Sequence, residues 1–256
     1  MPLKQLKRLV KSSPFLYRRL YPLVQRARLA KEERLINRFR DYCRTLSDRV
    51  AEPIFVKVGA NDGVTDDPCS DIFLANPKWR GLLIEPVPYC FASLQKNFPD
   101  RRRFILEQIA IGSPSGEAIF YYVDGNARNE MSDWQSWFDK LGSFDRQHIL
   151  KHLNGKLAPY IIECRVPVRP LTKILIQSRL PHVHILHVDT EGHDYEVLKT
   201  LDFSRFAPLA ILVEHCHLSA DKKAALRELL ERHGYAVQTS FSEYFAVNTK
   251  ADRRLR

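Results

Sequence analysis

The sequence predicts a doubly wound α/β domain that follows a helical N-terminal extension. After Glu52-Pro53, short apolar runs alternate with stretches of helical periodicity, which is typical of parallel strands buried between two layers of helices. Two of these runs lead directly into loops that hold glycine and acidic residues, at the strand ends where such sheets carry their ligands. With 256 residues, 45% of them hydrophobic, the chain can bury one substantial core.

Residues 51–256 are expected to form the main domain, with strands and helices in alternation. The predicted strands are Ile54–Val58, Leu82–Glu85, Phe104–Ala110, His184–Val188 and Leu209–Val213. The predicted helices are Ser70–Ala75, Tyr89–Asn97, Tyr195–Leu201 and Ala220–His233. Near the C-terminus, Ala236–Ser240 and Tyr244–Asn248 are expected to pair as two further strands.

Residues 124–160 interrupt this alternation, and we expect them to form an insertion in the domain. The segment is rich in aromatic side chains, namely Trp134, Trp137, Phe138 and Phe144. They can fold over a bound ligand and exclude water, or they can seal the open end of the sheet. His148 and His152 are four residues apart on a predicted helix, and we expect both on the surface because no third metal ligand stands beside them.

The basic charge of the chain is confined to its N-terminal extension. Residues 1–50 hold 14 Lys and Arg against 4 Asp and Glu, whereas residues 51–256 hold 26 residues of each sign. An enzyme that tracks a nucleic-acid backbone usually spreads its basic residues around the active cleft. The charge distribution therefore argues against a nucleic-acid partner.

The extension, residues 1–50, carries apolar residues at helical spacing between the basic ones. We expect broken amphipathic helices, interrupted at Ser12–Pro14 and at Tyr21-Pro22. They are expected to pack on their own domain or on a second copy of the chain; the alternative is contact with an anionic membrane or an acidic partner. Deletion of residues 1–40 is expected to leave ligand binding by the domain intact.

The five cysteines form an odd, scattered set without a C-x-x-C pair, which argues against a disulfide framework and against a structural zinc site. They are Cys43, Cys69, Cys90, Cys164 and Cys216. The basic N-terminus lacks the apolar stretch of a signal peptide, and no run of about 18 apolar residues occurs. We therefore expect a cytoplasmic protein, with a peripheral membrane location as the alternative.

The strongest local signal is the segment from Phe55 to Gly63, in which a strand runs into a glycine-bearing turn. Gly59 permits a tight turn, and Gly63 permits close approach of the backbone to a ligand. Asn61 and Asp62 complete the expected nucleoside-binding loop. The alternative is an acidic turn that binds nothing.

The composition of this loop argues against a dinucleotide. Asn61 and Val64 stand where a G-x-G-x-x-G fingerprint needs its second and third glycines. Like charges about 4 Å apart repel by roughly 4 kcal/mol at intermediate dielectric, so neighbouring carboxylates disfavour a pyrophosphate. The carboxylates concerned are those of Asp62, Asp66 and Asp67. A ligand that carries a sulfonium cation and an amine suits these surroundings.

Two later strands supply further candidates for nucleoside binding. Glu85 ends the second predicted strand, 22 residues after Gly63, where an acidic residue commonly accepts hydrogen bonds from ribose hydroxyls. The alternative is that Glu85 only caps the turn before Pro86. At the end of the third predicted strand, Gln108 or the backbone near Ile109 is expected to contact an adenine.

Four segments of the chain resemble the FkbM family of methyltransferases: Val58 to Gly63, Ile84 to Pro86, Asp189 to Leu198, and Glu214 at the end of its strand. The resemblance covers approximately residues 54–240. It implies a seven-stranded, Rossmann-like class I methyltransferase fold, with S-adenosylmethionine as the methyl donor and transfer usually to an oxygen. The expected acceptor is then a hydroxyl of a sugar, a lipid-linked glycan or a secondary metabolite.

Methyl transfer to a hydroxyl requires a base that removes the acceptor's proton. His215 is the first candidate because an imidazole titrates near neutral pH, and Glu214 is its neighbour. Side chains alternate along a strand, so only one of the two is expected to face the cleft. Asp189 is expected near the methionine portion of the donor or near the reacting methyl group.

No metal ion is expected. An alternative set of ligands for magnesium or manganese consists of Asp189, Glu191, Glu214 and His215. Glu191 can instead cap the helix that follows it. Two other functions stay open, a noncatalytic nucleoside-binding or scaffolding protein and a nicotinamide-dependent oxidoreductase.

Overall fold

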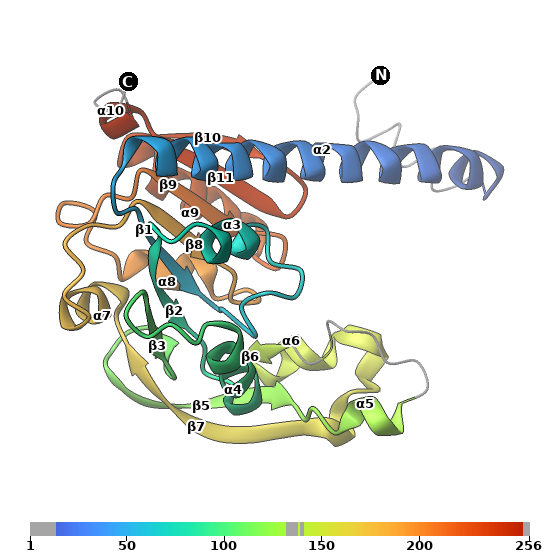
Figure 1. The fold of residues 1–256 in the computed structure, drawn as a ribbon. Helices are drawn as coiled ribbons and strands as arrows, with labels where there is room; N and C mark the ends of the chain where they lie inside the picture. Colours follow the sequence, from blue (N-terminus) through green and yellow to red (C-terminus); the bar gives the residue numbers. More distant parts are fainter. Residues whose placement is uncertain (1–13, 132–137, 139–140, 253–256) are drawn as a thin grey trace.

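The computed structural model describes residues 14–131, 138 and 141–252, which form two sheets and a long N-terminal helix (Figure 1). The main sheet has seven strands in the order β10-β11-β9-β8-β1-β2-β3. Their bounds are β1 Ile54–Val58, β2 Arg80–Ile84, β3 Phe104–Glu107, β8 Ile185–Val188, β9 Ala210–Glu214, β10 Tyr235–Thr239 and β11 Glu243–Asn248. Only β11 in this sheet runs antiparallel to its neighbours. The predicted doubly wound, seven-stranded sheet is therefore confirmed.

Helices cover both faces of this sheet. They are α3 Ser70–Ala75, α4 Pro88–Asn97, α7 Leu171–Gln177, α8 Asp194–Lys199 and α9 Ala220–Arg232, with α10 Thr249–Asp252 after the last strand. Alternate residues of one strand enter different cores, since Val56 belongs to one apolar cluster and Phe55 to another. Burial on both faces explains why the parallel strands read as continuous apolar runs.

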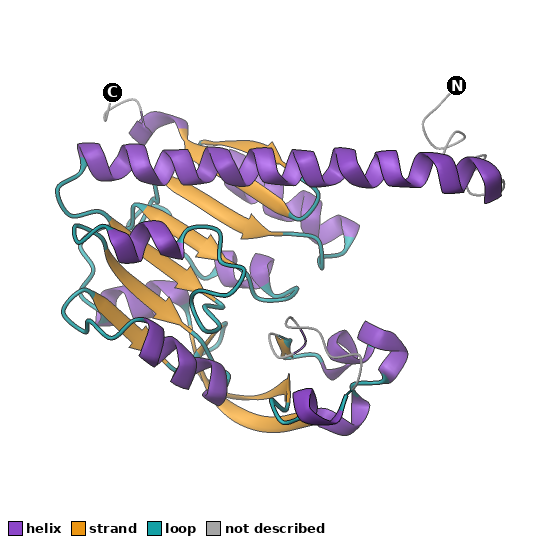
Figure 2. Cartoon of the chain, turned by 45° about the vertical axis from the view of Figure 1, so that its right-hand side comes forward, coloured by secondary structure: helices purple, strands orange, loops and turns teal. Residues whose placement is uncertain are grey.

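The described part of the N-terminal extension forms one helix, α2 Pro14–Arg49, of 36 residues. The predicted break at Tyr21-Pro22 is wrong, because the helix continues through Pro22 (Figure 2). An internal proline removes one backbone hydrogen bond and costs about 3 kcal/mol; Pro22 lies near the start of α2, and most of the helix follows it. Within the described residues, no helix combines the length and the apolarity needed to cross a bilayer.

The C-terminal half of α2 packs against the main sheet. Leu35, Phe39 and Cys43 are buried there at intervals of one helical turn, and the Phe39 ring lies edge-on to Phe245 of β11. The preceding turns extend beyond the sheet and leave Leu29 exposed (Figure 2). Leu35, Phe39, Cys43 and Leu46 of the extension are thus part of the core, so deletion of residues 1–40 would remove buried side chains, whereas its effect on ligand binding stays a prediction.

A second sheet, in the order β4-β7-β5-β6, was not predicted. Its strands are β4 Ala110–Ile111, β5 Gly116–Val123, β6 Gly142–Ser143 and β7 Ile161–Arg169. The predicted strand Phe104–Ala110 is wrong as a single element, because β3 ends at Glu107 and the chain re-enters extended structure in the second sheet at Ala110. Strands β5 and β7 are only partly buried, so neither shows the apolar run that marks the main sheet.

Short helices fill the segment between β5 and β7. They are α5 Ala127–Glu130, α6 Arg146–Leu150, η2 His152–Gly155 and η3 Ala158–Tyr160. They have a small apolar core of their own, in which Phe138 and Ile149 are fully buried. The predicted aromatic residues Trp134 and Trp137 lie outside the described residues.

Candidate active site

A cavity of about 440 Å³ lies at the carboxyl ends of β1, β2 and β8. These three strands end in register, since Val58 pairs with both Ile84 and Val188. The second sheet forms the opposite wall through Phe120 and residues 142–144. Five of the residues predicted to contact the nucleoside or the methyl donor line the cavity: Gly59, Asn61, Glu85, Ile109 and Asp189.

Gly59 allows the two main loops of the cavity to touch. Its backbone is left-handed (φ 76°), and a Cβ atom there would lie 1.7 Å from the carbonyl oxygen of Asp189. No other residue type fits this contact. The glycine therefore brings the loop after β1 against the loop after β8.

Glu85 is held by the backbone of both neighbouring loops. One carboxylate oxygen accepts the N–H of Asn61 at 2.7 Å, and the other accepts the N–H of Val87 at 2.8 Å. Burial raises the pKa of Glu85 to about 7, although the two backbone N–H groups act in the opposite direction. Glu85 therefore caps the turn after β2 and also presents its carboxyl group to the cavity.

Asp62 and Gly63, predicted to contact the cofactor, instead shape the turn and do not line the cavity. The Asp62 carboxylate accepts the N–H groups of Val64 and Thr65. A Cβ atom on Gly63 would lie 2.4 Å from the ring of Phe98, the residue that follows α4, so this glycine allows the loop to pack against the end of the helix. The side chain of a short aspartate satisfies its own turn more readily than it reaches a ligand.

Gln108 is exposed and also lies outside the cavity, whereas its neighbours Ile109 and Ala110 line it. The reason is the break between β3 and β4, which turns residues 109 and 110 inward as the chain crosses to the second sheet. An adenine contact in this region would consequently involve Ile109 and the backbone rather than the Gln108 amide.

Several lining residues were missed by sequence reasoning. Lys57, in the middle of β1, forms a buried ion pair with Asp67. Glu32 reaches the cavity from α2, and its carboxylate accepts the N–H groups of Phe241 and Ser242 in the turn between β10 and β11. No local pattern marks such residues, because their role arises when distant segments meet.

The cavity is acidic overall. Its carboxyl groups are those of Glu32, Asp66, Asp67, Glu85, Asp189, Glu191 and Glu243, against the single lysine Lys57 among the described lining residues. Burial raises the pKa of Glu243 well above its ordinary value, and the negative charges of Asp189 and Asp194 raise it further. A cationic ligand would relieve this repulsion.

Of the predicted catalytic residues, only Asp189 lines the cavity. The ring of His215 packs on Tyr244 at a centroid distance of 4.0 Å, and burial lowers its pKa. Glu214 accepts a hydrogen bond from the Cys216 thiol, and burial followed by nearby carboxylates raises its pKa far above the ordinary range. Neither is placed to remove a proton from a molecule in the cavity.

His193, which follows the acidic loop after β8, does line the cavity. Its ring lies 4.8 Å from the ring of Phe144, a residue of the segment between β5 and β7. Burial lowers the pKa of His193, so the imidazole is neutral and can accept a proton at pH 7. This residue was not selected from the sequence, because its place in the cavity depends on how the loop after β8 packs against Phe144.

The alternative metal set of Asp189, Glu191, Glu214 and His215 is not assembled, since His215 is turned to Tyr244. A different group forms instead. His148 is buried rather than on the surface, and its Nε2 lies 3.4 Å from Glu191 Oε2. The expected surface position of His148 is wrong, because α6 packs over the loop after β8.

The strand order, the single antiparallel strand β11 and the cavity over the carboxyl edge define the class I methyltransferase fold. Residues 57–237 match the family model described as the methyltransferase FkbM domain. Because the match covers more than half of the chain, the protein belongs to this family, as the sequence motifs indicated.

Three known proteins are similar to this chain in sequence or structure. "Methyltransferase 1" of Beauveria bassiana (strain ARSEF 2860) is 26% identical over 165 residues, which cover 63% of this chain and 64% of that protein. The solved methyltransferase FkbM of Methylobacillus flagellatus KT has a TM-score of 0.48 and 16% identity, over 77% of this chain and 43% of its own. Aeropyrum pernix fibrillarin, solved with natively bound S-adenosyl-L-methionine, has a TM-score of 0.41 and 12% identity, over 77% of this chain and 66% of its own. The chain thus spans less than two thirds of the first two relatives.

Proposed function

We propose that the chain is an S-adenosylmethionine-dependent methyltransferase that methylates a hydroxyl group of a sugar, a lipid-linked glycan or a secondary metabolite. The observation that carries the proposal is the acidic cavity at the carboxyl edge, with the Glu85 carboxyl group held toward it by two backbone N–H groups. Membership of the FkbM family supports the same reaction.

The residues of the cavity fit this donor better than a nicotinamide dinucleotide. Glu85 offers a carboxyl group to the ribose hydroxyls, and Ile109 offers an apolar surface to the adenine. Asp189 places negative charge where a sulfonium is attracted and a pyrophosphate is repelled. S-adenosylmethionine supplies an activated methyl group, and the chain's own residues orient the two reactants and remove a proton.

We further infer that His193, and not His215, accepts the proton of the acceptor hydroxyl. His193 lies in the cavity next to Phe144, whose aromatic face suits stacking against a sugar or another ring. Asp189 follows β8, its backbone lies against Gly59 of the loop after β1, and its carboxylate favours the positively charged methyl donor.

We propose a cytoplasmic location, which is supported by the odd, scattered set of five cysteines without a C-x-x-C pair. The exposed turns of α2 carry Leu23, Val24 and Leu29 among basic residues. This amphipathic stretch supports contact with an anionic membrane surface or an acidic partner, or with a second copy of the chain.

Calorimetry with adenosylhomocysteine and with NAD tests the donor. We expect saturable binding of adenosylhomocysteine and none of NAD, and a roughly tenfold loss of adenosylhomocysteine affinity in Glu85→Gln, since a hydrogen bond to a charged group contributes about 1.5–3 kcal/mol. Glu117→Gln, an exposed carboxylate outside the cavity, is the matched control. Binding of NAD without binding of adenosylhomocysteine would exclude the proposal. If adenosylhomocysteine binds, incubation of the protein with labelled methyl donor and fractionated extract identifies the acceptor.

A further inference from the structure

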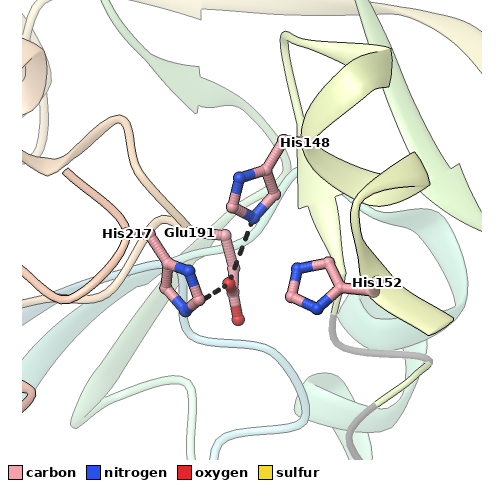
Figure 3. Close-up of side chains that lie close together, drawn as sticks. All are labelled: His148, His152, Glu191 and His217. Atoms are coloured by element: carbon pink, nitrogen blue, oxygen red, sulfur yellow. Dashed lines mark ion pairs between the residues drawn. The ribbon is translucent and has the colours of Figure 1, made fainter. Parts of the chain in front are cut away.

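Four metal-ligating side chains from separate parts of the fold meet beside the cavity (Figure 3). His148 comes from α6 and His152 from η2, both in the segment between β5 and β7. Glu191 comes from the loop after β8, and His217 from the loop after β9. One ligand atom of each lies within 4.8 Å of the others.

Two distances within this cluster, both to Glu191, fit ligands of one ion better than hydrogen-bonded partners. His148 Nε2 lies 3.4 Å and His217 Nε2 lies 3.3 Å from the same oxygen, Glu191 Oε2. Zinc binds imidazole nitrogen and carboxylate oxygen at about 2.0–2.2 Å, so neighbouring ligands of a tetrahedral site lie roughly 3.3–3.5 Å apart. A charge-assisted hydrogen bond would be shorter, at about 2.7–2.9 Å.

Two atoms at the centre of the cluster are buried without a hydrogen bond. They are Nε2 of His148, a residue only 9% exposed, and Oε2 of Glu191. A buried polar atom without a partner costs about 1–3 kcal/mol, and more if it is charged. Both atoms point at the space between the side chains, where an ion would satisfy them together (Figure 3).

The loop that carries Glu191 is built to hold this carboxylate in place. Glu191 has a left-handed backbone (φ 52°), and the fully buried Asp194 carboxylate accepts the N–H groups of Thr190 and Gly192 on either side of it. Gly192 is also left-handed, and a Cβ atom there would lie 3.5 Å from Cβ of His217. Glu191 and His217 are thus brought together by backbone geometry.

We propose that His148, His152, Glu191 and His217 bind one divalent transition-metal ion, for which zinc is the best match. Three imidazoles and one carboxylate suit a borderline ion such as zinc, whereas magnesium and calcium require mainly oxygen ligands. The ion ties the helices between β5 and β7 to the loops after β8 and β9. Because Glu191 also lines the cavity, the ion lies beside the bound substrates. The site does not depend on the proposed methyl transfer.

Metal content of the full-length protein, freed of any affinity tag, tests the site. The protein is treated with chelator and then titrated with zinc. We expect about one equivalent of bound zinc by inductively coupled plasma mass spectrometry, and a higher melting temperature than that of the metal-free protein. Cobalt is expected to give the visible absorption of a tetrahedral site. The double variant His152→Ala/His217→Ala should weaken zinc binding by at least about 100-fold, since even the loss of groups that only support ligands costs 10–100-fold.

His182→Ala, at an exposed histidine outside the cluster, is the matched control and should retain one equivalent. Glu191→Gln, which keeps the shape of the side chain, should also weaken zinc binding. Adenosylhomocysteine binding and circular dichroism show whether each variant is folded. The inference is overturned if the folded wild-type protein takes up no zinc at micromolar free metal, or if the folded double variant keeps a full equivalent.

Discussion

The loops after β1 and β8 concentrate residues with unusual backbone conformations. Gly59, Asn61 and Glu191 all have φ between 52° and 76°, a region that costs non-glycine residues energy. Each is held by a specific contact, as when the Asn61 N–H donates to Glu85. At the scale of single residues, the backbone conformation of these two loops therefore determines where the side chains of the site lie.

His193→Ala is expected to lower the turnover number by about 100-fold or more, because a general base contributes roughly 10²–10⁴-fold to the rate. Adenosylhomocysteine affinity should change little. The comparison variant is His215→Phe, in which a ring still packs on Tyr244 and no hydrogen bond is lost, since both ring nitrogens of His215 lack a partner. Its turnover number should stay close to that of the wild-type protein. Steady-state kinetics that show the reverse order would return the role of base to His215.

At the scale of elements, α2 has two different halves. Its C-terminal turns bury Phe39 against Phe245 and His187. Glu32 accepts two backbone N–H groups from the turn between β10 and β11. Its earlier turns leave Leu29 exposed. Helix α2 therefore helps to close the core and the cavity while its other half projects from the domain (Figure 1).

Phe39→Ala should lower the free energy of unfolding by about 3–5 kcal/mol, because the ring is fully buried and its removal leaves a cavity. Leu29→Ala, on the exposed half of the same helix, should change it by less than about 0.5 kcal/mol. Urea unfolding followed by circular dichroism measures both. Equal effects of the two substitutions would mean that α2 does not dock as described.

At the scale of the whole molecule, the cavity forms where the two sheets face each other, and the fold buries several carboxyl groups there. Glu85, Asp194 and Glu243 all have raised pKa values, for which burial is the first cause in each case. Folding thus favours the protonated forms of these groups. Bringing this much negative charge together is costly in the free protein and favourable once a cation binds.

The pH dependence of stability should report this burial. The pKa of Glu85 rises from an ordinary 4.5 to about 7 on folding, so its contribution to stability is complete below about pH 4.5 and is lost as the pH rises through 7. The loss amounts to at most about 3 kcal/mol. In Glu85→Gln this part of the decline should be absent between pH 5 and 8 in urea unfolding, whereas Glu117→Gln should follow the wild-type profile. Parallel profiles for all three proteins would contradict the raised pKa.

Much of the main sheet could be predicted from the sequence. Strands such as β1 and β8 are buried on both faces and pair with parallel neighbours, so their apolar runs are visible without knowledge of the partners. The positions of Gly59, Glu85 and Asp189 at the strand ends follow from the same alternation, because parallel strands end at one edge of the sheet.

The second sheet, the contribution of α2 and the histidine cluster were decided by tertiary structure alone. β5 and β7 are partly exposed and pair across a long intervening segment, so neither carries a strong local pattern. His148 and His217 are far apart in the chain, and only the packing of α6 over the loops of the main sheet brings them to Glu191. The local sequence determines the secondary structure of each segment, whereas contacts between side chains that are distant in the sequence depend on how the segments pack.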